Sequence, residues 1–118
     1  KLLIVEEVDV VSNSEKVDYD FLLNYVGGNE RLADKILVKI KNEMPKDIIL
    51  LKDAIDIKDW VDVAAIIHKV KPSIQMVGIT NVYDEMADLE SSIKEDEAIM
   101  GFENRGGELV RKLETLFI

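Results

Sequence analysis

The sequence predicts an all-α fold, namely an antiparallel up-and-down four-helix bundle with a short extra helix on its N-terminal side. From residue 17 onwards, apolar residues recur every three or four positions, helix-capping residues precede these runs, and short polar connections separate them. Four long helices of similar length joined by short loops favour neighbours that run in opposite directions.

The chain is long enough for one hydrophobic core, and residues 17–118 are predicted to form a single domain. Residues 1–16 are predicted to be an N-terminal extension or a linker. The first twelve of them are apolar and rich in β-branched residues, so we expect an extended segment or a short helix lying on the domain.

The first predicted helix is short and runs from Asp18, its N-cap, to Val26, where a pair of glycines stops it. Asn29 is predicted to cap a long second helix that reaches Ile55. Because proline lacks the N–H that a helix needs, we expect a kink or a one-residue break at Pro45.

Asp59 is predicted to cap the third helix, which carries His68 and which Gly78 ends. Thr80 is predicted to cap the next helix, and the last helix is expected from about Ala98 to Leu116. The glycine pair Gly106–Gly107 inside that helix is unfavourable, so it indicates either close packing against a neighbouring helix or a break.

Composition excludes several classes of function. A net charge of −9 argues against nucleic acid as a partner, because phosphate backbones attract basic surfaces. The chain has no cysteine and one histidine, which excludes disulfides and thiolate sites and argues against structural zinc. No apolar run approaches the roughly 20 residues that span a bilayer, so no direct membrane contact is expected.

The single histidine, His68, lies in the stretch AAIIHKVKPSIQMVG, which covers residues 64–78. In a helix, His68 falls one step off the apolar stripe, and Lys71 and Gln75 follow it on the same outer edge. The helix thus offers these three side chains together at its border with water, and all three are candidate catalytic residues. A neutral imidazole is a good nucleophile at neutral pH. Taken alone, however, a histidine on a helix is more often a surface residue without chemistry.

The larger pattern around His68 resembles the histidine-containing phosphotransfer (HPt) domain family over residues 17–118. The family motif H-x-L-K-G-S is matched by HKVKPS, and Gly78 stands ten positions after the histidine, as in the family. The flanking segments GGNERLADKIL, EMPKDIILLKDAI and KDWVDVAAIIH are also similar to the family, and they occur in the same order.

The resemblance implies a role for each residue of the site. His68 matches the position that takes a phosphoryl group from an aspartyl phosphate on a receiver domain and passes it to another receiver. Lys71 matches a lysine that neutralises the phosphoryl oxygens. Glu90, 22 positions after His68, matches a residue that hydrogen-bonds the imidazole, and Lys94 follows one turn later. The alternative for Glu90 and Lys94 is a surface ion pair worth only about 0.3–0.5 kcal/mol.

The resemblance also implies a docking surface for the receiver. It is expected to consist of apolar residues on the first two helices and of small residues beside the histidine: Phe21, Leu22, Tyr25, Leu32, Ile36, Pro72 and Ser73. Pro72 departs from the family, which has glycine there. The chain is therefore either a lineage variant that still transfers phosphate or a degenerate domain that only binds receivers.

The resemblance further implies no cofactor in this domain, since the receiver brings Mg²⁺, and a monomer whose partners are response-regulator receiver domains. It implies a cytoplasmic location, with the domain free or tethered as part of a membrane-bound hybrid sensor histidine kinase. The competing function is a non-catalytic helical adaptor that only binds receivers or dimerises. Such an adaptor needs exposed apolar surface over residues 19–36 and would be favoured by a buried His68.

Overall fold

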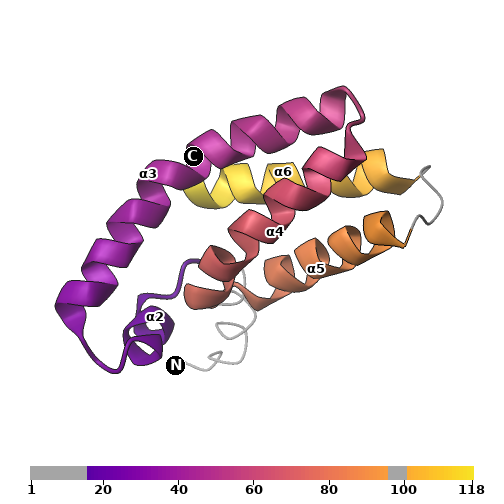
Figure 1. Cartoon of the computed structure of the whole chain (residues 1–118). Helices are drawn as coiled ribbons and strands as arrows, with labels where there is room; N and C mark the ends of the chain where they lie inside the picture. The colour runs from indigo at the N-terminus through magenta and orange to yellow at the C-terminus, as the bar shows by residue number, and fades with distance from the viewer. Residues whose placement is uncertain (1–15, 96–100) are drawn as a thin grey trace, which may run out of the picture.

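The computed structural model describes residues 16–95 and 101–118, and every regular element in these ranges is a helix. The predicted all-α class is therefore confirmed. The five helices are α2 (Tyr19–Tyr25), α3 (Glu30–Asp56), α4 (Trp60–Met76), α5 (Thr80–Lys94) and α6 (Phe102–Phe117) (Figure 1). The predictions for residues 1–15 and for a last helix beginning near Ala98 fall partly or wholly outside the described residues.

Local capping explains where the first three helices begin. The side chains of Asp18, Asn29 and Asp59 each accept a hydrogen bond from the backbone N–H three residues later, at 3.0–3.1 Å. These bonds satisfy donors that would otherwise be unpaired in the first turn. The predicted N-caps of these three helices are confirmed.

The predicted cap of α5 is wrong. Ile79, not Thr80, is the N-cap residue, and it provides no side-chain hydrogen bond. Gly78 has a φ of +75° and turns the chain immediately after α4, so that Thr80 is already the first residue of the next helix. Ile79 is fully buried. Its burial holds the junction between α4 and α5, a role that a polar cap would otherwise have.

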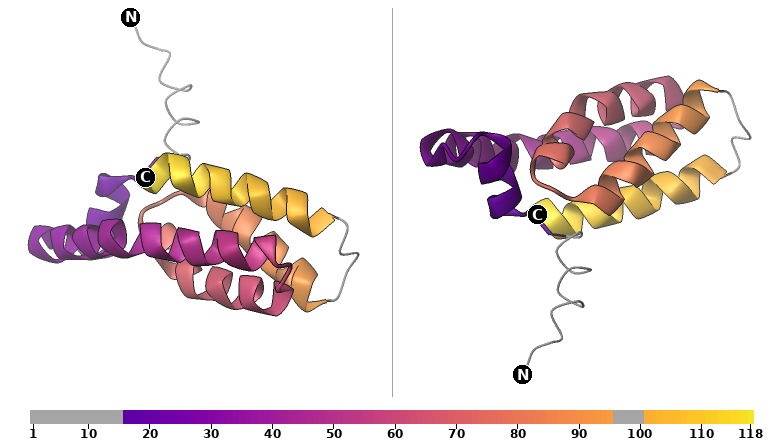
Figure 2. Two further views of the ribbon diagram at one scale, coloured as in Figure 1. Left: turned by 90° about the horizontal axis from the view of Figure 1, so that it is seen from above. Right: turned by 90° about the horizontal axis from the view of Figure 1, so that it is seen from below.

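Helix α3 is continuous through Pro45, so the predicted one-residue break is wrong. Figure 1 shows that this long helix curves along its length, in keeping with the N–H that proline lacks. Helix α4 likewise continues past Pro72 to Met76. Figure 2 shows that the N-terminal part of α3 extends beyond the other long helices, with α2 beside it.

The core lies between the four long helices. Helix α3 contacts α4 and α6, and α5 contacts the same two helices, while α2 contacts α3 and α4. Each helix buries residues at helical spacing, as α3 does with Ile40, Met44, Ile48, Leu51 and Ile55. Trp60 and Phe102 meet edge to face with ring centroids 5.5 Å apart, joining the starts of α4 and α6.

The glycine pair in α6 is explained by close packing, because α6 runs unbroken from Phe102 to Phe117. Gly106 is buried, and a Cβ atom there would lie 2.8 Å from Cδ1 of Ile55 on α3. Gly107 has open space around it. One glycine of the pair therefore lets α3 and α6 approach closely, and the other has no steric role.

Candidate functional site

His68 lies on the outer surface of α4. Its neighbour Ile67 is fully buried and holds the helix against the core, which turns the imidazole outwards. The His68 side chain is 72% exposed. A buried His68 would favour a non-catalytic adaptor, and His68 is not buried.

Glu90 of α5 lies beneath the imidazole and is almost completely buried, with 5% of its side chain exposed. Its Oε2 atom is 3.1 Å from Nδ1 of His68. The interpretation of Glu90 as a surface ion-pair residue is thus wrong. A buried carboxylate needs partners, because removing an unpaired charge from water costs several kcal/mol.

Two lysines supply those partners. Lys71 Nζ lies 2.7 Å from Oε1 of Glu90, and Lys94 Nζ lies 2.9 Å from Oε2. Burial by itself would raise the pKa of Glu90, but the hydrogen bonds from Lys71 and Lys94 outweigh it and lower the pKa to about 2. Glu90 is therefore ionised at neutral pH.

The ionised carboxylate decides the state of the imidazole. A carboxylate only accepts hydrogen bonds, so Nδ1 of His68 carries the hydrogen and donates it to Glu90. In a neutral ring the lone pair then resides on Nε2. The arrangement presents an exposed nitrogen nucleophile with two ammonium groups in its immediate surroundings, which suits the transfer of an anionic group.

The structure brings together four of the five predicted catalytic residues, namely His68, Lys71, Glu90 and Lys94. Gln75 is exposed two turns further along α4 and lines a separate hollow of about 290 Å³ with Phe21 and Tyr83. It therefore borders the site without belonging to the hydrogen-bonded cluster.

The predicted docking residues divide into three groups. Phe21, Tyr25 and Leu32 are exposed and available to a partner. Ile36 is half-buried in a groove between α3 and α4. Leu22 is fully buried, so its assignment to the docking surface is wrong: it belongs to the core cluster, to which it attaches α2.

The two predicted residues beside the histidine differ in their surroundings. Pro72 is exposed on the same side of α4 as His68, one turn further along. Ser73 is half-buried and lines the groove between α3 and α4.

Two contacts near the site were missed in the sequence. Lys71 lies over the ring of Tyr83, 5.8 Å from its centroid, in a cation–π arrangement that helps to fix the lysine. Lys69 donates a 2.9 Å hydrogen bond to Asp47 of α3, and this bond raises the pKa of Lys69. Residues so far apart in sequence give no local signal that they are in contact. Asp47 lies 22 positions before Lys69, and His68 lies the same distance before Glu90.

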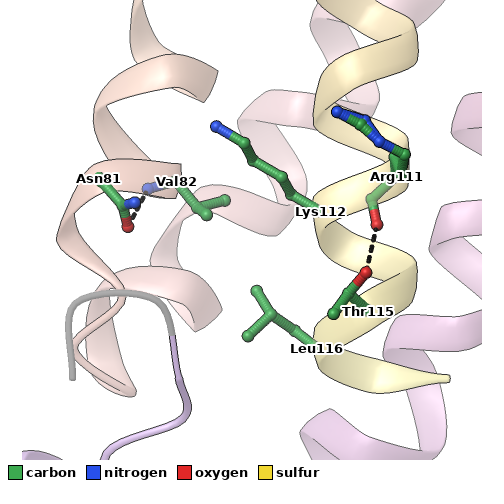
Figure 3. A pocket seen from close by; sticks show the side chains of 6 residues that line it. All are labelled: Asn81, Val82, Arg111, Lys112, Thr115 and Leu116. Carbon is green, nitrogen blue, oxygen red and sulfur yellow. Dashed lines mark hydrogen bonds between the residues drawn. The ribbon is translucent and has the colours of Figure 1, made fainter. Parts of the chain in front are cut away.

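A further hollow, of about 230 Å³, lies between α5 and α6 (Figure 3). Val82 and Leu116 form its apolar part, and Lys112 and Arg111 lie at its rim. Both cations are paired, Lys112 with Glu85 at 2.6 Å and Arg111 with Glu108 at 2.5 Å. None of the predicted site residues lines this hollow.

Two negative findings apply to residues 16–95 and 101–118. None of their helices is both long enough and apolar enough to cross a membrane. These ranges also contain no group of three or more His, Asp or Glu side chains that could hold a metal ion.

Comparison with models of known protein families finds no match for the chain, and searches of curated proteins and of solved structures find none either. The function must therefore be inferred from the residues and geometry described above.

Proposed function

We propose that the chain is a histidine-containing phosphotransfer domain and that His68 carries a phosphoryl group from one receiver domain to another. The observation that carries the proposal is an exposed imidazole whose Nδ1 is bonded to a buried, ionised carboxylate. A surface histidine without a function has no need of a buried Glu90 that is itself paired with two lysines.

The proposal includes the antiparallel up-and-down four-helix bundle of that family for α3, α4, α5 and α6. Two features support it: the pairing of α3 and α5 with the same two neighbours, α4 and α6, and the short connections from α3 to α4 and from α4 to α5. In this arrangement α4 and α5 lie side by side, which keeps His68 and Glu90 in register.

The proposed reaction is a single displacement at phosphorus. The Nε2 lone pair of His68 attacks the phosphorus atom of an aspartyl phosphate on the receiver, a P–N bond forms, and the P–O bond to the aspartyl carboxylate breaks. The carboxylate leaves as an anion, and the imidazole keeps its Nδ1 hydrogen and becomes cationic. Glu90 stabilises that cation, and Lys71 and Lys94 offset the phosphoryl charge.

The receiver is proposed to contribute the Mg²⁺ for the reaction, and this domain to act as a monomer without a cofactor. The domain would work in the cytoplasm, alone or as part of a sensor kinase. Pro72 is compatible with transfer because it is exposed and leaves α4 continuous on both sides of His68.

A transfer assay with the variant His68→Gln tests the proposal. Receiver domains charged with ³²P-labelled acetyl phosphate are mixed with the wild-type domain and with the variant. We expect the wild type to become labelled and His68→Gln to remain unlabelled, because a glutamine amide is not a nucleophile. Equal labelling of both proteins would exclude His68 as the acceptor, and binding of receivers without labelling of the wild type would favour the adaptor.

A further inference from the structure

We infer that the two lysines bonded to Glu90 have different roles once His68 is phosphorylated: Lys94 leaves the carboxylate and binds the phosphoryl oxygens, whereas Lys71 stays on Glu90 as its counter-ion. The inference rests on the proposed function, because it concerns the phosphorylated form of His68. Both lysines contribute positive charge to the site, but only Lys94 contacts the phosphoryl group. The resemblance to phosphotransfer domains instead implies that Lys71 neutralises the phosphoryl oxygens.

The two lysines bond different oxygens of Glu90. Lys71 Nζ lies 2.7 Å from Oε1, which the imidazole does not use. Lys94 Nζ lies 2.9 Å from Oε2, and this is the oxygen that accepts the hydrogen bond from Nδ1 of His68 at 3.1 Å. The imidazole and Lys94 therefore compete for one oxygen atom, and a stronger bond from the ring weakens the hold on Lys94.

The charge on the imidazole changes in the proposed reaction. Before it, one carboxylate and two ammonium groups lie beside the neutral ring that attacks. When a phosphoryl group is bound to Nε2 the ring is cationic, and a hydrogen bond between a cation and a carboxylate is about twice as strong as a neutral one. The ring and Lys71 then compensate Glu90, one on each oxygen. Lys94 can leave without exposing the buried carboxylate to the cost of an unpaired charge.

Burial also distinguishes the two lysines. The side chain of Lys71 is 20% exposed, and its ammonium group lies 5.8 Å from the centre of the Tyr83 ring, so that moving it would break two contacts. The side chain of Lys94 is 61% exposed and belongs to the last residue of α5. Because Nδ1 of His68 faces Glu90, a phosphoryl group on Nε2 lies on the outer side of the ring, where a long exposed side chain can reach it.

A third lysine, Lys69, follows His68 directly in the sequence but is not free to take this role. It bonds Asp47 of α3 at 2.9 Å, and the Asp47 side chain is only 12% exposed. Glu43 adds a second negative charge near Lys69. Moving Lys69 to the phosphoryl group would leave the largely buried Asp47 without this partner, which is unfavourable.

The test replaces one lysine at a time by glutamine, which removes the positive charge but keeps an N–H donor. The variants are Lys71→Gln, Lys94→Gln and, as the matched control, Lys52→Gln. Lys52 is 60% exposed, nearly the same as Lys94, but it lies on α3 and its nearest carboxylate, 4.0 Å away, is that of Glu114 on α6. Each protein is phosphorylated with phosphoramidate, a small donor from which ammonia leaves as the P–N bond to Nε2 forms. The phosphorus-31 NMR shift of the phosphohistidine is then followed from mildly acidic to mildly alkaline pH.

This titration gives the pKa of the phosphoryl group as it changes from monoanion to dianion. A cation in contact favours the dianion and lowers that pKa, so removing the cation raises it. We expect Lys94→Gln to raise the pKa of the phosphoryl group by about 1 or more relative to the wild type. Lys71→Gln should raise it by less than half as much, and Lys52→Gln should leave it unchanged.

The outcomes separate the inference from the proposed function. A rise in Lys71→Gln as large as in Lys94→Gln, or equal values for Lys94→Gln and Lys52→Gln, would overturn the inference. The second comparison involves two exposed positions, so it decides the question even if Lys71→Gln does not fold. Transfer from receivers is measured separately with the wild type, and its success would leave the proposed function standing whatever the titration shows. If phosphoramidate does not label His68 in the wild type, the inference fails.

Discussion

At the scale of single residues, Glu90 is the side chain on which the geometry around His68 depends. One of its oxygens accepts from the imidazole and from Lys94, and the other accepts from Lys71. Because a buried carboxylate is stable only when it is well paired, the same contacts that hold the lysines also keep Glu90 ionised. The orientation of His68 is therefore fixed by electrostatics as well as by packing.

The pKa of Glu90 predicts a specific dependence of stability on pH. The pKa is about 2 in the folded protein and 4.5 ordinarily, so the folded state holds the proton less tightly than the unfolded state. The contribution of Glu90 to stability is thus complete above about pH 5 and is lost as the pH falls towards 2. We expect the difference in free energy of unfolding between wild type and Glu90→Gln to shrink over this range, by an amount on the order of a few kcal/mol.

Urea denaturation followed by circular dichroism at several pH values measures that difference. Comparing the two proteins at each pH cancels the titration of the other carboxylates, which both share. A difference that is independent of pH between 5 and 2 would show that Glu90 is not held ionised by its neighbours.

At the scale of elements, the contact between α3 and α6 depends on one glycine of a pair. The Cβ atom of an alanine at position 106 would lie 2.8 Å from Ile55 Cδ1, whereas an alanine at 107 would meet nothing within 4 Å. Both glycines have the same unfavourable helix propensity, so their substitution separates propensity from packing.

We expect Gly107→Ala to raise the free energy of unfolding by about 0.5–1 kcal/mol, because alanine loses less backbone freedom on folding. Gly106→Ala should raise the free energy of unfolding by less than Gly107→Ala does, or should lower it, because Ile55 has to move to make room for the added methyl group. In an Ile55→Val background, which lacks Cδ1, the effect of Gly106→Ala should become more favourable. Urea titrations of the four variants measure these effects, and equal gains at both positions would contradict the close contact.

The elements that the sequence predicts correctly are those fixed by neighbouring residues. Asp18, Asn29 and Asp59 cap helices through bonds that reach only three residues along the chain. The junction between α4 and α5 was mispredicted because burial of Ile79, a tertiary effect, replaces the polar cap expected at Thr80. Continuity of α3 through Pro45 is also tertiary in origin, because packing on both sides of the proline offsets the missing hydrogen bond.

At the scale of the whole molecule, the candidate site was largely predictable because its residues share two adjacent helices. The histidine and Lys71 follow from helical periodicity, and Glu90 and Lys94 follow from the resemblance to phosphotransfer domains. The depth of Glu90 could not be predicted, because it depends on how α4 and α5 are packed. For the same reason, the sequence could not distinguish exposed Phe21 from its buried neighbour Leu22.

The identity of the phosphorylated atom is the most direct test of the central claim. The wild-type domain is labelled by a charged receiver and its phosphorus-31 and nitrogen-15 NMR spectra are recorded. We predict one nitrogen-linked phosphoryl group, on Nε2 of His68, because Nδ1 is held by Glu90. A phosphoryl group on Nδ1, on an oxygen atom or on any other residue would contradict the account.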